Sequence, residues 1–129
     1  PTEREARLAL SNYEDGLVVL AEALRIKTNA RNIGITLGAE GLLIHAAHPE
    51  KTQWLTDRVP TLNTAPKDTA GAGDCLLVCS AMALALGWTV WESLYLGSVA
   101  AACQVGRIGN IPLTAAEILI ETQEKNGIY

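Results

Sequence analysis

The sequence lacks two features that would each point to a particular class of protein. Its ten Lys and Arg residues form no run and the formal net charge is −4, so the basic patch of a nucleic-acid-binding protein is missing. The longest apolar stretch, Cys75 to Leu86, is too short to span a bilayer and is followed by Gly87. We therefore expect neither nucleic acid nor a membrane as a partner.

Cysteine is also scarce. The three cysteines, Cys75, Cys79 and Cys103, lie in apolar segments. An odd number without regular spacing argues against a disulfide framework. This pattern favours a reducing, cytoplasmic compartment. Cys75 and Cys79 are one helical turn apart, which favours core packing as their use.

The composition that remains is that of a globular domain. The chain has 129 residues, of which 49% are hydrophobic and 19% are charged, enough to bury a core in one domain. It begins at Pro1 rather than Met and enters a helical pattern at once. We therefore expect residues 1–129 to be a single, truncated part of a longer protein.

The order of the predicted elements is helices, hairpin, strands and then three helices, which suits part of a layered α/β domain. Helices are predicted from spacing and capping boxes over Thr2–Leu10, Ser11 to about Lys27, Cys75–Leu86, Thr89 to about Val105 and Thr114 to about Glu124. Strands are predicted over Ile33–Leu37, Leu42–Ala46, Gln53–Leu55 and Arg58–Leu62. The first two strands flank a glycine-containing turn and predict a hairpin, and Pro49 and Lys51 are placed in a loop. Cys75–Leu86 is apolar all round, which predicts a buried helix.

The stretch Asp68-Thr69-Ala70-Gly71-Ala72-Gly73-Asp74 is the most informative part of the chain. Glycines let a backbone turn tightly and approach a ligand, and the first N–H groups of the following helix form a natural anion site. The amides of Gly71, Ala72 and Gly73 would hold a transferring phosphate, and the Asp74 carboxylate would accept the proton of an attacking hydroxyl. No Lys-Ser/Thr pair follows the glycines, so the loop is not a Walker A motif.

A simpler interpretation is a glycine-containing loop with Asp74 at a helix N-terminus. The full string in front of an apolar helix favours the functional interpretation, and at this point a family resemblance becomes visible. The string resembles the second signature of the pfkB carbohydrate kinases, which include ribokinase, fructokinase, adenosine kinase and heptose-phosphate kinases. Residues 36–41 are similar to the family's nucleotide-contacting hairpin, and Ala100 through Pro112 is similar to its late helix and closing loop.

The resemblance implies an α/β fold, namely the C-terminal part of a ribokinase-like three-layer α/β/α domain with a nucleotide-side β-hairpin. It also implies roles for single residues. Asp74 would be the general base, and the loop from Gly71 through Ala72 and Gly73 to Asp74 would form the anion hole. The positions implied for ATP contacts are Thr36, Gly38, Gly41 and Ser98, and those implied for metal ions are Glu5 for Mg²⁺ and Asp68 for a monovalent cation.

Two positions depart from the family pattern. Thr2-x-x-Glu5 falls where the family carries Asn-x-x-Glu, a motif serving magnesium and phosphate, and only Glu5 matches. Ser98 stands where many relatives have an Asn near the adenine. These departures support an alternative function, a non-catalytic nucleotide- or sugar-sensing module that keeps the kinase fold.

The function that the resemblance implies is ATP-dependent phosphorylation of a sugar or sugar-phosphate hydroxyl. ATP and Mg²⁺ would be its cofactors, with a monovalent cation such as K⁺ in many members, and assembly into a homo-oligomer is left open. The spacing around Arg107-Ile108-Gly109 and the extended link before Asp68 favour heptose-phosphate-kinase-like members. We expect the fragment alone to be inactive, because the family's sugar-binding half is absent.

Several of these residues also have purely structural interpretations. Thr2-x-x-Glu5 satisfies a capping box, and residues 36–41 on their own could be a plain hairpin turn. Arg107 could contact a nucleotide or cap the preceding helix. His45 and His48 follow a strand without a cysteine or carboxylate cluster, which argues against a zinc site. An NAD-binding Rossmann unit is disfavoured, because its glycine-rich turn should follow the first strand.

Overall fold

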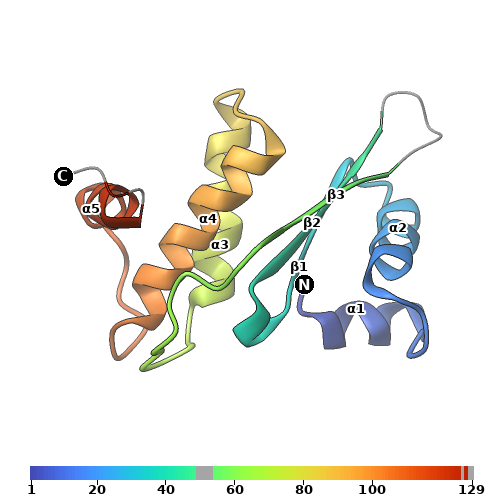
Figure 1. The fold of residues 1–129 in the computed structure, drawn as a ribbon, viewed down its shortest axis with the longest axis horizontal. Helices are drawn as coiled ribbons and strands as arrows, with labels where there is room; N and C mark the ends of the chain where they lie inside the picture. The colour runs from blue at the N-terminus through green and yellow to red at the C-terminus, as the bar shows by residue number, and fades with distance from the viewer. Residues whose placement is uncertain (49–53, 126, 128–129) are drawn as a thin grey trace. The chain divides into compact units, whose positions relative to one another are not determined.

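The fold is known from a computed structural model, which describes residues 1–48, 54–125 and 127. The chain divides into two compact units, Pro1–Pro60 and Thr61–Tyr129. The first contains α1 (Glu3–Leu10), α2 (Leu17–Thr28), β1 (Asn32–Thr36), a 3-10 turn (Gly38–Glu40), β2 (Leu42–Ala47) and β3 (Trp54–Val59) (Figure 1). The second contains α3 (Ala72–Ala85), α4 (Val90–Val105) and α5 (Ala115–Lys125). The expectation of a single domain stays a prediction.

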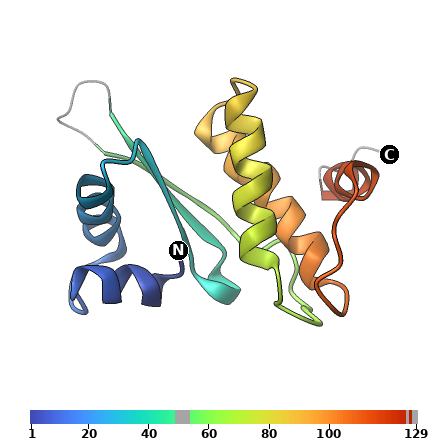
Figure 2. The same ribbon diagram turned by 180° about the vertical axis from the view of Figure 1, so that it is seen from behind.

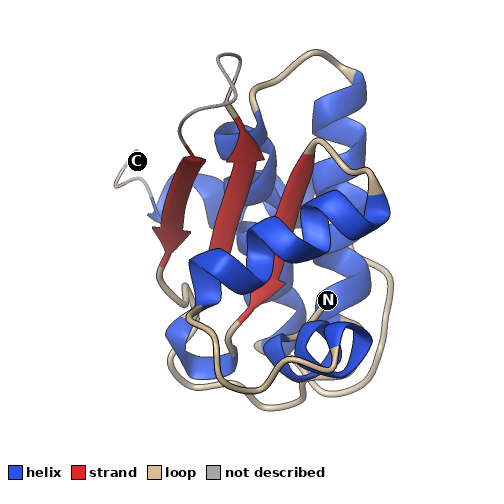
Figure 3. Ribbon diagram, turned by 90° about the vertical axis from the view of Figure 1, so that its right-hand side faces the viewer, coloured by secondary structure: helices blue, strands red, loops and turns tan. Residues whose placement is uncertain are grey.

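The first unit is an antiparallel sheet in the order β1-β2-β3, with α1 and α2 against one face (Figure 3). Thr36 pairs with Leu42 and Leu42 with Val59, so the predicted hairpin is confirmed. Apolar side chains at helical spacing on α2 meet alternate residues of the strands, as burial of one stripe and one sheet face requires. The core consists of Ala6, Leu20, Ala21, Leu24, Ile33, Ile35 and Leu43.

The second unit is built on α3 and α4, which run along each other (Figure 2), with α5 against α4. Two predicted capping boxes start α4 and α5. The Thr89 hydroxyl accepts the Glu92 N–H at 3.3 Å while the Glu92 carboxylate accepts the Thr89 N–H at 3.0 Å. Thr114 and Glu117 repeat this arrangement. The helix starts were predictable because these side chains satisfy amides that the helix itself cannot.

The capping box predicted at Ser11–Glu14 is wrong. Ser11 ends α1 in the left-handed region, with φ of 51°, and α2 begins only after Gly16, which has no side-chain cap. Asn12 and Asp15 bind each other instead, with Nδ2 to Oδ2 at 2.7 Å, and Arg7 donates to the Asp15 carbonyl at 3.1 Å. Because these contacts fold the segment into a turn, the second helix starts later than the sequence pattern indicates.

The two strands predicted at Gln53–Leu55 and Arg58–Leu62 are a single strand, β3. It pairs with β2 without a break, from Trp54 opposite Ala47 to Val59 opposite Leu42. The continuous partner explains why the polar residues in the middle of β3 do not interrupt it. Gln53, and the predicted loop positions Pro49 and Lys51, lie outside the described residues.

The helix predicted at Cys75–Leu86 exists as α3, but its burial all round is wrong. Leu77, Val78 and Met82 are 65%, 55% and 63% exposed, and among its described residues only Ser80 and Ala83 are buried. Among the described residues of the second unit, α3 packs mainly along α4, which covers one face of the helix. In the part of the chain that the structure describes, no helix is long and apolar enough to cross a membrane.

A polar network fastens α2 to the sheet of the first unit. Glu22 lies 2.7 Å from Nε2 of the fully buried His45, whose Nδ1 lies 2.8 Å from the Thr56 hydroxyl. Arg25 donates two hydrogen bonds to the same carboxylate at 2.8 Å. Chiefly because of the bonds from Arg25, the pKa of Glu22 falls from 4.5 to about 2.

This network predicts a specific loss of stability in acid. The pKa of Glu22 is lower in the folded chain, so its stabilising contribution is complete above pH 4.5 and disappears as the pH falls through about 2. Glu22→Gln should lower the urea midpoint at neutral pH and flatten its pH dependence between these values. Glu14→Gln, at an exposed position, is the matched control and should keep the wild-type profile. Parallel profiles for Glu22→Gln and wild type would contradict the assignment.

The contact between α3 and α4 depends on Gly97. A Cβ at this position would lie 2.1 Å from Ser80 Oγ and 2.6 Å from the Leu76 carbonyl oxygen. Since the second neighbour is helix backbone, it cannot turn aside as a side chain can. Gly97 therefore sets how closely the two helices approach.

Gly97→Ala should destabilise the protein by about 1–3 kcal/mol through overpacking. Ser80→Ala should by itself be close to neutral, because the buried Ser80 hydroxyl has no hydrogen-bond partner among the described residues. In the double variant Ser80→Ala should restore only part of the loss, since the Leu76 carbonyl remains. Free energies of urea unfolding for the four proteins test this; full recovery would show that the backbone contact is unimportant.

Candidate functional site

The start of α3 presents unsatisfied backbone N–H groups, although the predicted Ala72 N–H is not one of them. Gly71 is the N-cap residue, with φ of +77°, and Ala72, Gly73 and Asp74 form the first turn. The Ala72 N–H donates to the Thr69 carbonyl at 3.3 Å, whereas the N–H groups of Gly73 and Asp74 have no acceptor within the described chain. At the positive end of a helix dipole, such amides are suited to an anion.

Asp74 stands beside these amides. Its side chain is exposed, and it makes no hydrogen bond or ion pair to any described residue. A carboxylate without a partner is available to accept a proton from an incoming hydroxyl. The structure therefore brings together, on one helical turn, the two chemical groups that the sequence placed in this loop.

The loop before α3 is fastened to the loop after α4 by Asp68. One carboxylate oxygen accepts the Ala70 N–H at 2.9 Å and the other accepts the Gly109 N–H at 3.0 Å. These two bonds, from Ala70 first and then Gly109, lower the pKa of the Asp68 carboxyl below its usual value. The backbone adds a further tie, since the Lys67 N–H donates to the Val105 carbonyl at 2.7 Å.

Gln104 completes this fastening and was missed by the sequence analysis. Its side chain is fully buried, and Nε2 donates to the Gly109 carbonyl at 3.2 Å and lies 3.4 Å from the Ala70 carbonyl oxygen. Asp68 thus accepts the N–H groups of Ala70 and Gly109, and the carbonyl groups of the same two residues face Gln104. The available signal was a lone amide side chain at the end of an otherwise small and apolar helix stretch.

Gly71 is required where the two loops meet. A Cβ at Gly71 would lie 2.1 Å from Asn110 Oδ1, and a φ of +77° is strained for any residue with a side chain. The positive φ explains the glycine, whereas the contact with Asn110 involves the end of an exposed side chain that could turn aside.

Arg107 joins the end of α4 to α5. Its guanidinium donates to Glu117 Oε1 at 3.0 Å, to Gln104 Oε1 at 3.1 Å and to the Ile111 carbonyl. With these three partners the side chain acts as a fastener of the closing loop. This supports a structural use of Arg107 over contact with a nucleotide.

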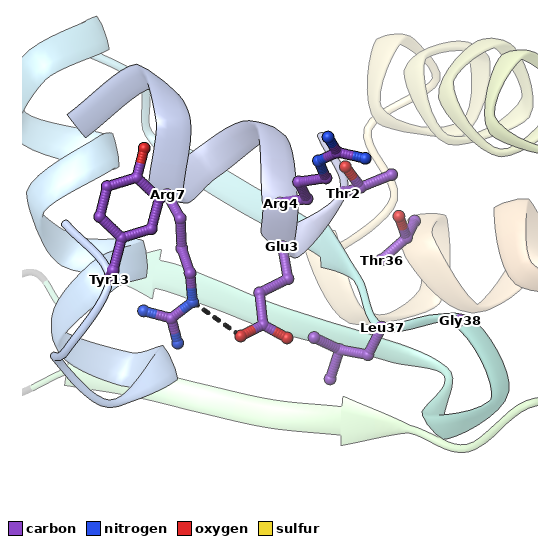
Figure 4. A pocket seen from close by; sticks show the side chains of 8 residues that line it. All are labelled: Thr2, Glu3, Arg4, Arg7, Tyr13, Thr36, Leu37 and Gly38. Atoms are coloured by element: carbon purple, nitrogen blue, oxygen red, sulfur yellow. Dashed lines mark hydrogen bonds and ion pairs between the residues drawn. The ribbon is translucent and has the colours of Figure 1, made fainter. Parts of the chain in front are cut away.

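In the first unit, the end of β1 and the start of α1 line an open pocket of about 430 Å³ (Figure 4). Thr36 and Gly38, two of the positions implied for ATP contacts, both belong to it. The backbone of Thr2 bridges to Thr36 in parallel, and the Thr36 N–H donates to the Pro1 carbonyl at 2.9 Å. The pocket is lined by Thr2, Glu3, Arg4, Arg7, Tyr13, Thr36, Leu37 and Gly38.

Arg4 is a second residue that the sequence analysis missed. It is exposed at the pocket and forms no hydrogen bond or ion pair to the residues that the structure describes. Arg7, in contrast, is held by Glu3 at 2.8 Å and by the Asp15 carbonyl. Arg4 is therefore the cation of this pocket available for an anionic ligand, and its place inside Thr2-x-x-Glu5 was the signal.

The other predicted site residues make local structural bonds. Glu5 accepts the Thr2 N–H at 2.7 Å in a capping box, which is the main cause of its lowered pKa. Ser98 donates to the Leu94 carbonyl at 2.8 Å, and the Gly41 N–H closes the turn onto Gly38 at 3.1 Å. Within residues 1–48, 54–125 and 127, no group of three or more His, Cys, Asp or Glu side chains could hold a metal ion. The metal and nucleotide roles of these residues stay predictions.

The comparisons with known proteins concern the family of the chain and its fold. The model of the pfkB family carbohydrate kinases matches residues 1–116. The chain belongs to this family. The sequence resemblance is thereby confirmed on most of the chain, including both the hairpin and the start of α3.

Individual pfkB relatives extend the comparison. The chain is 32% identical over 122 residues to the bifunctional protein HldE of Trichlorobacter lovleyi, covering 92% of this chain and 24% of that protein. It thus spans about a quarter of the length of the curated relatives it matches.

Solved structures confirm the predicted ribokinase-like fold. The ribokinase of Thermotoga maritima superimposes with a TM-score of 0.78 at 25% identity, over 95% of this chain and 41% of that one. Phosphofructokinase-2 of Escherichia coli, in a complex with potassium, superimposes with a TM-score of 0.80 at 16% identity, over 98% and 40%. The second likeness shows the fold alone.

Proposed function

We propose that the intact protein is an ATP-dependent kinase that phosphorylates a hydroxyl group of a sugar or sugar phosphate. The observation that carries the proposal is the first turn of α3, where the unpartnered Asp74 carboxylate stands beside the open N–H groups of Gly73 and Asp74. Membership of the pfkB carbohydrate kinases supports the same reaction class.

In the proposed reaction Asp74 accepts the proton of the sugar hydroxyl. The oxygen attacks the γ-phosphorus of ATP, the bond from that phosphorus to the β–γ bridging oxygen breaks, and ADP leaves. Charge on the moving phosphoryl group is stabilised by the helix-end amides, which are already fixed in direction before the reaction. Gly71 supports this arrangement by holding the turn that aims them.

The pocket of the first unit would contribute contacts to the ATP phosphates. The Thr36 hydroxyl and the backbone at Gly38 are suited to phosphate oxygens, and Arg4 adds a positive charge where the family motif has lost its Asn. Mg²⁺ would neutralise phosphate charge when bound with ATP. Glu5 is the residue of this pocket region proposed to face it, through the carboxylate oxygen that Thr2 leaves open.

The substrate is proposed to be a sugar phosphate of the heptose type. This rests on the spacing around Arg107-Ile108-Gly109 and the link before Asp68, together with matches to several proteins named HldE. The sugar itself would be bound by parts of the protein other than the pocket of the first unit and the start of α3.

Potassium is the one family cofactor that does not fit the residues present. Asp68 is the position expected to bind a monovalent cation, and the related phosphofructokinase-2 was solved with potassium. Here both Asp68 oxygens accept N–H groups, from Ala70 and Gly109. The carbonyl oxygens of these same two residues, which lie on the two loops that Asp68 joins, face the Gln104 amide.

Asp74→Asn in the intact protein should lower kcat by about 10²–10⁴-fold, because the amide cannot accept the hydroxyl proton. ATP binding should persist, since the helix-end amides remain. Sugar-dependent ADP release and calorimetric ATP titration measure the two effects. Asp15→Asn, whose carboxylate contacts only Asn12 among the described residues, is the matched control. Turnover near wild type in Asp74→Asn would remove the residue from the role of base.

Arg4→Gln should weaken ATP binding by about tenfold, the size expected for one charge-assisted hydrogen bond to phosphate. The effect should appear mainly in the KM for ATP and shrink at high salt, because the contact is exposed and screened. Arg31→Gln removes another exposed arginine, outside the pocket, and should leave the KM unchanged. Equal KM values for the two variants would count against a phosphate contact at Arg4.

A further inference from the structure

Three oxygen atoms gather around the nitrogen of the Gln104 side-chain amide. Nε2 of Gln104 has three oxygen neighbours, the carbonyl of Gly109 at 3.2 Å and the carbonyl of Ala70 and Oδ1 of Asn110 at 3.4 Å. Groups of carbonyl oxygens of this kind replace the hydration shell of potassium in proteins. In this chain the centre of the group is occupied by a nitrogen that belongs to the protein.

The orientation of the amide follows from Arg107. Its guanidinium donates to Oε1 of Gln104 at 3.1 Å, and a guanidinium can only donate. The oxygen of the amide must therefore face Arg107 and the nitrogen must face the carbonyl groups. Arg107 also polarises the amide, which strengthens the N–H groups as donors. The positive charge of Arg107 thus acts on the oxygen cluster through Gln104.

We propose that the Gln104 amide, polarised by Arg107, takes the place of a bound monovalent cation and makes the loop before α3 independent of potassium. Asp68 holds the N–H groups of Ala70 and Gly109, and Gln104 holds their carbonyl groups, so the two loops are joined without an ion. Gln104 is a positioning residue: it does not contact the reacting atoms but fixes Ala70, next to the Gly71 turn.

The position of Gln104 in α4 supports this role over simple packing. The preceding helix stretch from Ala100 to Cys103 is small and apolar, and a buried amide there is costly unless its hydrogen bonds are made. A packing role would need only a side chain of this length. A packing role does not require the hydrogen bonds that the amide makes, from Nε2 to the loop carbonyl groups and from Arg107 to Oε1.

The first test compares the intact wild-type protein in potassium chloride and in tetramethylammonium chloride at equal ionic strength. The readouts are the midpoint of thermal unfolding and the dissociation constant for ADP. We expect the ADP dissociation constant to agree within about twofold between the salts. A gain in ADP affinity of about tenfold or more with potassium would overturn the proposal.

The second test removes the amide in two ways. Gln104→Ala leaves room among the oxygens, and Gln104→Met fills it with an apolar chain of similar length. Both should weaken ADP binding by about tenfold in tetramethylammonium, because the loop carbonyls lose their donor. Potassium should restore affinity and unfolding midpoint in Gln104→Ala but not in Gln104→Met.

A packing role predicts that the methionine variant is the milder of the two in either salt, and that result would overturn the proposal. Gln123→Ala, at an exposed position on α5, is the control for loss of an amide. If the alanine variant folds in neither salt, the wild-type comparison decides. The inference depends on the proposed function only for its ADP readout. If the protein shows no kinase turnover but its unfolding midpoint does not depend on potassium, the proposed function is refuted and the inference about Gln104 stands.

Discussion

The contact between the loop before α3 and the loop after α4 is the constraint on which the candidate site depends. Asp68 and Gln104 divide the polar groups of Ala70 and Gly109 between them, one taking the N–H groups and the other the carbonyl groups. The loop before α3 is largely exposed and made mostly of small residues, so its backbone depends on these hydrogen bonds. They hold the residues just before Gly73 and Asp74 and thereby support the direction of the open amides.

Close packing of backbone serves the same end at two glycines. Gly71 lets the loop approach Asn110, and Gly97 lets α4 approach α3 at Ser80 and Leu76. The first brings the two loops together and the second fixes the helix that carries the amides. The geometry of the site is thus determined by residues without side chains as much as by Asp74 itself.

Much of this could be predicted from the sequence, and the reasons are local. The capping boxes at Thr89 and Thr114, the hairpin around Gly38 and the loop ending in Asp74 are each specified by residues close together in the chain. The errors came where contacts outside the predicted pattern decide the structure. The turn at Asn12 is held by Asp15 and by Arg7 on α1, and β3 is continuous because it pairs with β2 along its whole length.

The two overlooked residues show the same limit. In the sequence Arg4 is an ordinary charged residue of a helix, and its place in a pocket with Thr36 is apparent only in the folded unit. Gln104 is likewise an ordinary residue near a helix end, and its contacts with the two loops are apparent only in the structure. The prediction that α3 is buried all round was wrong for a related reason. Hydropathy reports what a helix could bury, whereas the neighbours available within the unit decide what it does bury.

The parallel bridge between Thr2 and Thr36 connects the N-terminal helix to the hairpin. Because the Pro1 carbonyl accepts the Thr36 N–H, the start of α1 is joined to the end of β1. Glu5 in turn accepts the Thr2 N–H, so a displacement at the end of β1 would also disturb the capping box that starts α1.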